Sequence, residues 1–516
     1  MTNPAEVLRR NAATAGHKAA LRFEGRTQTH AELYDRAKRL ANALRTHGVD
    51  AGDRVAVAAD NCFETLEMLA GLTLGGYVRC PLYTHDGPER HRYLIELTEP
   101  TAIILADKYF HALAPVLADC PFIRTVVVIG SDVVAPAHDY EALLRSTAAD
   151  EPESEPAPED PHQIRFSAGT TGLPKGILHT LGAWMAAGDE VLADVSPPLN
   201  AEDCYLAASP LTHAASVPVW PTLAAGGTIV VMPAFDAGKF LELVEQERVT
   251  LTLLVATMVQ MITTHPDAGA RDLSSLRAIL YGASPIPETT LVAALKLWGN
   301  VMYQSYGQSE AIPVAALLPE HHVVDGTPEQ RRRLRSAGKA TPNSGIRIVD
   351  ENDNVLAPGE VGEIVVNSPG RMQEIWRAPE VTAQRLTSDG WVRTRDMGWL
   401  DDDGFLYLAD RKEDMIISGG YNIWPAELEN ALAEHPAVRE AAVVGIPHEK
   451  WVETPHADVV LEEGCAGTVS AQELVEWTRE RLGSVKKITS VEFVDALPKT
   501  PIGKVLRREI RDRYRS

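Results

Sequence analysis

The sequence predicts an α/β protein built from several subdomains, and three observations lead to this fold class. The chain has 516 residues, which at roughly 150 residues per domain corresponds to about three domains or subdomains. Apolar residues recur at helical spacing from Ala31 to His47, and a β-branched run from Arg54 to Ala58 follows. Because this helix–turn–strand alternation recurs beyond Cys120, parallel α/β layers are expected.

The third observation is a change of pattern in the later part of the chain. Between Ser344 and Val366, alternating apolar residues are interrupted by turn residues, which indicates a small β-rich subdomain. A second break lies near Leu408 to Asp414, and the roughly 100 residues after it form a separate C-terminal lobe. In this lobe the pattern predicts helices at Glu427–Glu434 and Ala471–Leu482, and strands at Ala441–Ile446 and Ala457–Leu461.

The composition is that of an ordinary folded protein, with 45% hydrophobic and 23% charged residues. Disordered, collagen-like and coiled-coil chains are therefore excluded. The 49 Lys and Arg residues against 71 Asp and Glu residues give a net charge of −22, and the isoelectric point is near 5.2. Such a surface repels phosphate backbones and anionic lipids, so binding to nucleic acid or to a membrane surface is disfavoured. An anionic ligand needs a local pocket.

The chain shows no pattern of secretion or membrane insertion. Residues Met1 to Arg10 lack the basic start and apolar stretch of a signal peptide, and no apolar run approaches the ~20 residues that span a bilayer. The 5 cysteines are scattered without a CxxC pair, so neither a disulfide framework nor a zinc site is expected. We expect a soluble cytoplasmic protein without a membrane span.

A phosphate-binding loop is the strongest local signal. The segment IRFSAGTTGLPKG, Ile164 to Gly176, places small residues and hydroxyls after a short apolar lead and then a lysine. Glycines let backbone N–H groups approach phosphate oxygens, hydroxyls donate hydrogen bonds, and a lysine neutralises phosphate charge. The alternative for this segment alone is a flexible Gly/Ser/Thr loop. The residues expected to bind phosphate are Ser167, Gly169, Thr170, Thr171, Gly172 and Lys175.

This loop resembles the signature loop of the adenylate-forming superfamily, which contains acyl- and aryl-CoA synthetases, luciferases and the adenylation domains of peptide synthetases. The resemblance continues in order through nearly the whole chain. Its further motifs are SPLTHAA (Ser209 to Ala215), YGASPIP (Tyr281 to Pro287), YGQSEA (Tyr306 to Ala311), GWVRTRD (Gly390 to Asp396), DRKEDMIISGGYNIWPAELE (Asp410 to Glu429) and LPKTPIGKVLRREI (Leu497 to Ile510).

The resemblance implies a two-part fold. Residues 1–410 are expected to form a large AMP-binding domain, made of doubly wound α/β subdomains and a small β-barrel. Residues 411–516 are expected to form a smaller, mobile C-terminal α/β lid domain. The hinge is expected at about 410–414, with Glu413 as the pivot.

Two carboxylates are expected to bind the nucleotide and its metal. Glu310 is a hard oxygen ligand of the kind that holds Mg²⁺, and the alternative for an isolated acid is a helix start. The resemblance implies the metal role and a catalytic role for Glu310, with Thr170 as a second catalytic residue. Asp396 suits the two ribose hydroxyls as an acceptor, and Arg395 stands beside it where the family commonly has glycine. The resemblance implies nucleotide contacts by Gly282, Ala283, Ser284, Tyr306 (stacked on adenine), Gly307, Ser309, Asp396 and Arg411.

The resemblance also implies a mostly apolar pocket for a carboxylic acid. His213 would border the carboxylate and the channel of the second substrate, although a lone histidine is often structural. Ala256 stands where relatives often have proline. The other residues implied to bind the acid are Ala215, Met258, Tyr281 and Met302, and Gly420 is implied to leave room for a pantetheine arm.

The last motif is expected to supply a catalytic lysine. By composition alone, Lys504 would belong to a solvated basic face. The resemblance instead implies that Lys504 reaches across the domain interface to the acyl carboxylate and the α-phosphate.

The function implied is ATP- and Mg²⁺-dependent activation of a medium-chain, long-chain or aryl carboxylic acid to an acyl-adenylate, followed by transfer to CoA. One alternative is an adenylating enzyme of secondary metabolism that passes the adenylate to a carrier protein or an amine, or that adenylates an unusual acid such as nitrite. Another is a non-catalytic nucleotide-binding relative. The expected partners are small molecules, with no nucleic acid, and a homodimer is left open.

Overall fold

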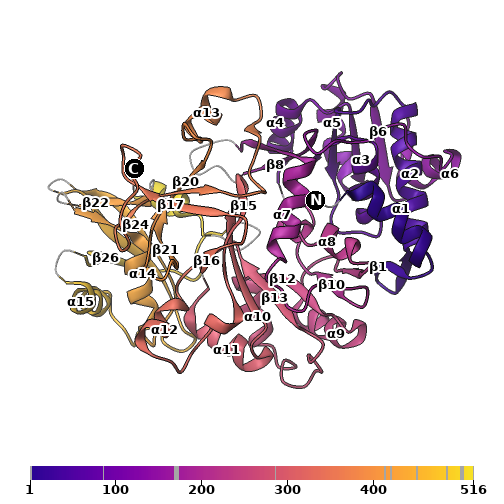
Figure 1. The fold of residues 1–516 in the computed structure, drawn as a ribbon. Helices are drawn as coiled ribbons and strands as arrows, with labels where there is room; N and C mark the ends of the chain where they lie inside the picture. The colour runs from indigo at the N-terminus through magenta and orange to yellow at the C-terminus, as the bar shows by residue number, and fades with distance from the viewer. Residues whose placement is uncertain are drawn as a thin grey trace.

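The structure is a computed structural model that describes residues 3–84, 86–167, 174–284, 286–411, 414–418, 421–448, 451–483, 486–499 and 505–514. Figure 1 shows a large N-terminal part, coloured from indigo to orange, and a smaller C-terminal part that ends in yellow on the opposite side. Both parts mix helices and strands, which confirms the predicted fold class. Within these residues, no helix is both long enough and apolar enough to cross a membrane.

The first subdomain is an 8-stranded, mostly parallel sheet. On its strand β3, Val55 and Val57 pack into one core, and Ala56 and Ala58 pack into another on the opposite face. A strand buried on both faces needs a helix layer on each side, so this sheet is doubly wound, as predicted. Its strands, in spatial order, are β19 (Glu374–Ile375), β9 (Gly176–Thr180), β8 (Pro161–Phe166), β4 (Val78–Pro81), β3 (Arg54–Ala58), β5 (Ala102–Ala106), β6 (Thr125–Ile129) and β7 (His138–Asp139). One face packs against α2 (His30–Thr46), α3 (Thr65–Leu74) and α6 (Tyr140–Ser146), and the other against α4 (Pro88–Thr98) and α5 (Asp107–Ala118).

The second subdomain is a 9-stranded sheet built on the same plan. On β10, Tyr205 and Ala207 face one core and Leu206 faces the other. The strands, in spatial order, are β16 (Lys339–Ala340), β15 (Ala311–Leu317), β14 (Met302–Gln308), β13 (Ala278–Gly282), β12 (Leu251–Val255), β10 (Cys204–Ala207), β11 (Thr228–Val231), β1 (Ala19–Phe23) and β2 (Arg26–Thr29). One face packs against α1 (Pro4–Ala15), α7 (Leu181–Val191) and α8 (Val219–Ala224), and the other against α9 (Ala237–Glu247), α10 (Ala256–Thr263) and α11 (Glu288–Trp298).

The β-rich subdomain is a 4-stranded antiparallel sheet. Its order is β17 (Gly345–Val349), β18 (Gly362–Asn367), β20 (Val392–Leu400) and β21 (Leu406–Arg411). In the described residues β17 and β21 are its two edges, so the region expected to be a small barrel is an open sheet. Two short helices accompany it, α12 (Pro328–Arg333) and α13 (Pro379–Gln384).

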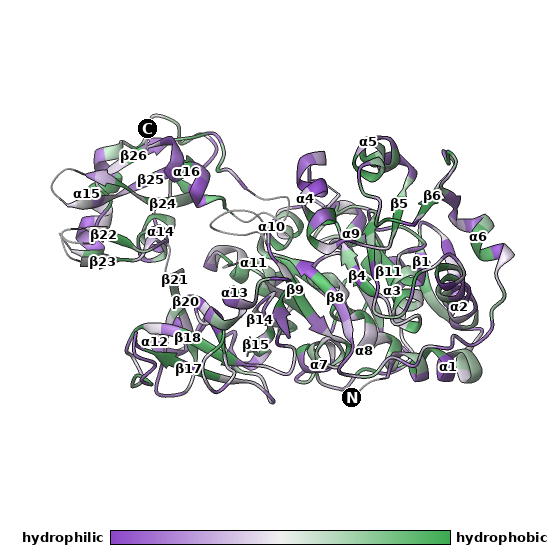
Figure 2. Cartoon of the chain, turned by 90° about the horizontal axis from the view of Figure 1, so that it is seen from above, coloured by the Kyte–Doolittle hydropathy of each residue, from purple (hydrophilic) through white to green (hydrophobic). Residues whose placement is uncertain are grey.

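The C-terminal domain has its own cores, whose members all come from residues 416–514. Figure 2 shows it to one side of the rest of the molecule. Its elements are β22 (Ile416–Ser418), β23 (Tyr421–Ile423), α14 (Pro425–Ala433), β24 (Val438–His448), β25 (Val452–Leu461), α15 (Ala471–Leu482), β26 (Ser490–Phe493) and α16 (Arg507–Arg513). The four elements predicted from the sequence are α14, β24, β25 and α15. Arg335 and Glu434 join the two parts of the chain at 3.3 Å.

Candidate active site

Three neighbouring parallel strands, β12, β13 and β14, bring their carboxyl ends to one edge of the second sheet. This is where doubly wound sheets bind ligands. At the end of β13, a Cβ atom on Gly282 would lie 2.2 Å from the carbonyl oxygen of Ser305, so only glycine fits beside β14. The next residue, Ala283, has φ of +68°. Strained backbone of this kind persists only where the surroundings impose it, and it is common at binding sites.

The YGQSEA motif and the GWVRTRD motif meet at this edge. The Tyr306 hydroxyl donates to Oδ2 of Asp396 at 2.7 Å. The Gln308 side-chain amide donates to the same oxygen at 2.5 Å and to the Thr394 carbonyl at 3.0 Å. The Asp396 backbone lies opposite Arg411 on the paired strand β21. The two residues expected to hold ribose are therefore neighbours across one strand pair.

Glu310 lies in the turn between β14 and β15, so it does not begin a helix. The Met372 amide donates to the Glu310 carbonyl at 2.7 Å and fixes the turn. Its carboxylate forms an ion pair of 2.6 Å with Arg385, and the two side chains are only 14% and 9% exposed. Arg385 follows α13 and lies 75 residues along the chain. Sequence reasoning missed Arg385, because no local pattern marks a contact at this separation.

The predicted phosphate loop connects β8 and β9. At its base, the Ser167 amide donates to the Lys175 carbonyl at 3.0 Å, so the two ends of the loop are bonded to each other. Tyr83 donates to the Phe166 carbonyl at 2.6 Å, and Tyr93 donates to the Pro174 carbonyl at 3.1 Å. The predicted residues Gly169, Thr170, Thr171 and Gly172 lie outside the described residues.

Two buried arginines lie behind this loop. Arg165 on β8 stacks over the Trp184 ring, with 5.2 Å from its guanidinium carbon to the ring centre. Burial lowers the pKa of Arg165, while electrostatic interactions with Glu310 and Tyr83 oppose that shift. Arg79 on β4 donates to the Leu211 carbonyl at 2.9 Å. Buried positive charge acts strongly because the surroundings screen it little, so both guanidinium groups favour an anion at the loop.

His213 lies where the two large sheets approach each other. It stacks on Tyr83, which follows β4 of the first sheet, with ring centres 4.2 Å apart and planes 18° apart. Its Nδ1 lies 2.8 Å from the Thr212 hydroxyl. Asn61 holds the motif in place, because its side-chain amide donates to the Ser209 carbonyl and accepts from the Leu211 amide. His213 is thereby held beside Tyr83, which also contacts the base of the phosphate loop.

Most of the other residues expected to line the acid pocket are buried in the protein core. Tyr281 is 1% exposed, and its hydroxyl lies 2.8 Å from Nε2 of His322. Ala215 and Met302 are fully buried in the two cores of the second subdomain, whereas Met258 is partly exposed at the start of α10. Their contact with a substrate stays a prediction.

Comparison with known proteins decides the family. The family model described as AMP-binding enzyme matches residues 8–376, and the one described as AMP-binding enzyme C-terminal domain matches residues 427–504. The chain belongs to the AMP-binding enzyme family. The predicted membership of the adenylate-forming superfamily is therefore confirmed.

Acid–CoA ligases match this AMP-binding enzyme over nearly their whole length. A feruloyl-CoA synthase of Amycolatopsis sp is 37% identical over 510 residues, which cover 98% of each protein. An indoleacetate–CoA ligase of Aromatoleum aromaticum is 36% identical and covers 98% of this chain and 97% of its own.

Solved structures agree in fold. The amide bond synthetase McbA of Marinactinospora thermotolerans has a TM-score of 0.88 and 30% identity, covering 99% of this chain and 100% of its own. ATP-bound MatB of Rhodopseudomonas palustris has a TM-score of 0.89 and 27% identity, covering 99% of each chain.

The C-terminal domain of this AMP-binding enzyme carries the predicted lysine motif. Lys499 and Val505, on either side of the segment that contains Lys504, form an antiparallel bridge. Asp414, the last residue of the predicted hinge, forms ion pairs with Arg511 at 2.8 Å and Arg507 at 3.6 Å, both on α16. Lys504, Gly420 and the predicted pivot Glu413 themselves lie outside the described residues, as does the side chain of Arg411.

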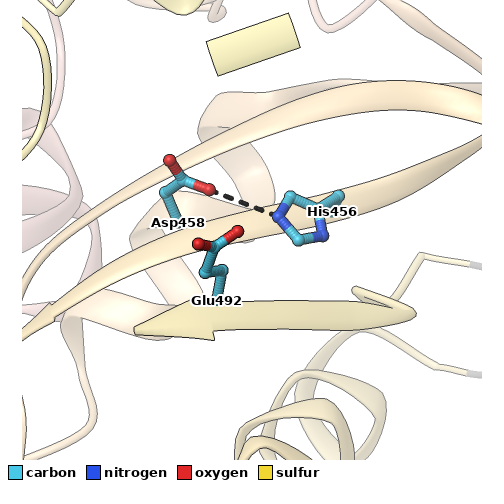
Figure 3. Close-up of side chains that lie close together, drawn as sticks. All are labelled: His456, Asp458 and Glu492. Carbon is cyan, nitrogen blue, oxygen red and sulfur yellow. Dashed lines mark hydrogen bonds and ion pairs between the residues drawn. The ribbon is translucent and has the colours of Figure 1, made fainter. Parts of the chain in front are cut away.

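A cluster of metal-ligand type lies in the same domain, away from the nucleotide site, and Figure 3 shows its members His456, Asp458 and Glu492. These side chains already bond to protein groups. His456 lies 3.2 Å from Asp458, and Tyr514 donates to both Asp458 and Glu492. Arg513 pairs with Asp458 at 3.1 Å. The cluster therefore fastens the end of α16 to β25 and β26.

Proposed function

We propose that this AMP-binding enzyme is an acid–CoA ligase whose substrate is an aryl-substituted carboxylic acid. The observation that carries the proposal is the match to feruloyl-CoA synthase over 98% of both chains. The indoleacetate–CoA ligase is also named for an aromatic acid. The site is compatible with this chemistry, because a carboxylate for ribose lies at the edge of the second sheet and a cationic environment for phosphate lies beside the loop of the first sheet.

The reaction has two steps. A carboxylate oxygen of the acid attacks the α-phosphorus of ATP, and pyrophosphate leaves with the electrons of the broken P–O bond. The sulfur of CoA then attacks the carbonyl carbon of the acyl-adenylate, loses its proton, and AMP leaves. Positioning and charge stabilisation supply the catalysis, since no enzyme-bound covalent intermediate is needed.

Asp396 is proposed to accept hydrogen bonds from the ribose hydroxyls, with Arg411 beside it. Tyr306 supports this role because its hydroxyl already fixes the carboxylate, which leaves the ring to stack on adenine. Gly282 and Ala283 provide a close backbone approach at the end of β13. The proposed nucleotide contacts further include Ser167, Gly169, Thr170, Thr171, Gly172, Lys175, Ser284, Gly307 and Ser309.

Glu310 is proposed to hold Mg²⁺. The donor is chemically suitable, because a carboxylate is a hard oxygen ligand and Mg²⁺ commonly takes one or two of them together with substrate phosphates. Only Oε1 of Glu310 is used by Arg385, and Oε2 has no hydrogen bond among the described residues. Mg²⁺ bound there would neutralise phosphate charge during adenylation.

The acid is proposed to bind near the stacked pair of His213 and Tyr83. Two stacked rings at the meeting point of the sheets offer an aromatic acid a flat surface, and the phosphate loop begins one hydrogen bond away at Phe166. Met258 is the partly exposed apolar neighbour proposed for the same pocket. The acid pocket is proposed to be shaped also by three buried residues, Ala215, Tyr281 and Met302. Gly420 is proposed to face the pantetheine arm of CoA.

The test is a pyrophosphate-release screen over a panel of carboxylic acids, followed by mass spectrometry of the products with CoA. Cinnamic-type and arylacetic acids should give the fastest release and a CoA thioester. An amide product with an added amine would favour the chemistry of the amide bond synthetase, to which the chain is 30% identical. Faster turnover of straight-chain fatty acids than of aryl acids would contradict the proposed substrate class. Release of no pyrophosphate with any acid, nitrite included, would contradict an adenylating function.

A further inference from the structure

The ion pair between Glu310 and Arg385 is buried, and its cation is only partly satisfied. Arg385 is 7% exposed. Its Nη2 donates to Glu310 Oε1 at 2.6 Å and lies 3.4 Å from Gln308 Oε1. Its Nε is buried and has no hydrogen-bond partner among the described residues. A buried guanidinium donor without a partner costs free energy, so this group is a candidate to meet a further acceptor.

Arg385 also stands in the middle of a hydrogen-bonded chain. Through Gln308, it connects the carboxylate proposed for the metal with Asp396, the carboxylate proposed for ribose. Moving Arg385 would therefore disturb both ends of the nucleotide site. A planar guanidinium with several fixed N–H donors suits this bridging position better than the single ammonium of lysine.

We propose that Arg385 is a positioning residue that makes the Glu310 site select the metal–nucleotide complex over the free metal ion. This inference rests on the proposed function. The positive charge of Arg385 neutralises Glu310, so a free dication gains little from the carboxylate and is repelled by the guanidinium. The complex of Mg²⁺ with ATP is a net anion, so the same guanidinium attracts it, and the spare Nε offers a donor to a phosphate oxygen.

The experiment measures binding, without acid or CoA. Mn²⁺ serves as a spectroscopic probe of free-metal binding in the full-length enzyme, and calorimetry measures binding of Mg²⁺ with a non-hydrolysable ATP analogue. In Arg385→Gln, the affinity for free Mn²⁺ should rise by about tenfold or more, because a neighbouring charge shifts such equilibria by roughly one to three powers of ten. Affinity for the metal–nucleotide complex should fall.

Two further variants separate charge from structure. Arg385→Lys keeps the charge, so it should still reject free Mn²⁺ while it loses part of the nucleotide affinity. Arg385→Met removes the charge but keeps an apolar chain of similar length in the buried site, and it should behave like Arg385→Gln. Arg377→Gln is the matched control, because it removes an exposed arginine that pairs with Glu99 just before α13.

Unchanged Mn²⁺ and nucleotide binding in folded Arg385→Gln or Arg385→Met would overturn the inference, and thioester formation by the wild-type enzyme would leave the proposed function standing. Equal loss of both kinds of binding in all three Arg385 variants would also overturn it, since that pattern indicates a purely structural role. A wild-type enzyme that binds no metal–nucleotide complex would overturn the inference and the proposed function together.

Discussion

The Tyr306 hydroxyl lies 2.7 Å from Oδ2 of Asp396, so the ring expected to stack on adenine also fixes the carboxylate expected to hold ribose. The two residues come from β14 of the second sheet and β20 of the β-rich sheet. A nucleotide that contacts both residues would therefore connect two subdomains. Because the carboxylate is already oriented, little side-chain freedom remains to be lost on binding.

Asp396→Ala should weaken binding of ATP and AMP by roughly tenfold to a hundredfold. A hydrogen bond to a charged acceptor contributes about 1.5–3 kcal/mol, and about 1.4 kcal/mol corresponds to a factor of ten. Calorimetry with AMP measures the change directly. Tyr306→Phe, which keeps the ring and loses the hydroxyl, should have a smaller effect. Asp389→Ala, on the exposed turn before β20, is the matched control. Unaltered AMP affinity in Asp396→Ala would rule it out as the ribose ligand.

Glu310→Gln should raise the Mg²⁺ concentration needed for half-maximal pyrophosphate release by about tenfold, because the amide loses the charge of the acceptor. It should also lower stability, since breaking a buried ion pair from one side typically costs about 3–5 kcal/mol. The double variant Glu310→Gln with Arg385→Met removes the unpaired cation. It should regain stability in chemical denaturation without regaining activity. Recovery of activity in the double variant would show that Glu310 serves only to neutralise Arg385.

Arg395 should report backbone strain beside the nucleotide site. Its φ is +60°, a region in which side chains with a Cβ atom cost about 1–2 kcal/mol. Arg395→Gly should therefore be more stable than Arg395→Ala by about 1 kcal/mol in chemical denaturation. Lys296, which is exposed on α11, is the matched control. There the alanine variant should be more stable than the glycine variant by about 1 kcal/mol, because glycine is the poorer helix former. If Arg395→Ala were as stable as Arg395→Gly, or more stable, strain at Arg395 would be contradicted.

His322 should make stability depend on pH. Burial lowers its pKa from 6.5 to about 4. The Leu318 carbonyl accepts a hydrogen bond from Nδ1, so in the neutral ring Nε2 accepts from Tyr281. Below pH 6.5 the unfolded chain binds a proton that the folded chain does not, so stability is complete above pH 6.5 and falls as the pH drops toward 4.

Denaturation curves between pH 4 and 7.5 measure this effect. His322→Gln should reduce the slope of stability against pH below pH 6.5 by up to about 1.4 kcal/mol per unit. His162 and His179, whose pKa values burial lowers to about 3, should maintain the remaining slope. The exposed His17 provides the matched control. A slope unchanged by His322→Gln would mean that this histidine is not held neutral by burial.

Much of the fold could be predicted because local pattern and packing agree. The helix predicted over Ala31–His47 is α2, whose start is fixed by the capping box of Thr29 and Glu32. The C-terminal strands were predicted too short. Strand β24 extends to His448, and its last residues pair with Glu453 and Thr454 of β25. Backbone pairing continues through polar residues, which an apolar pattern does not reveal.

The candidate site could be predicted only where its residues belong to continuous motifs. Arg385 and Tyr83 were missed, because each reaches its partner from a distant part of the chain. Tyr281 and Met302 show a second limit. They lie on strands of the second sheet, and both face the core on the side of α9 to α11. The alternation of a strand separates its two faces, but it does not tell which face lies beside a ligand.

Lys504→Ala should separate the two half-reactions. A preorganised positive charge near the developing negative charge typically contributes about 10²–10³-fold to the rate, and thiol attack on a finished adenylate needs no such contact. Acid-dependent pyrophosphate release should therefore fall by about that factor. Thioester formation from chemically supplied acyl-adenylate should persist. A parallel loss of both reactions, at an unchanged melting temperature, would show that the lysine serves both steps.

The most direct measurement combines ATP, CoA and a cinnamic-type acid in one reaction and counts the products. The account predicts one acyl-CoA thioester and one AMP for each pyrophosphate released, with no thioester when ATP or the acid is omitted. Pyrophosphate and AMP without a thioester, in a reaction that contains CoA, would contradict the assignment as an acid–CoA ligase.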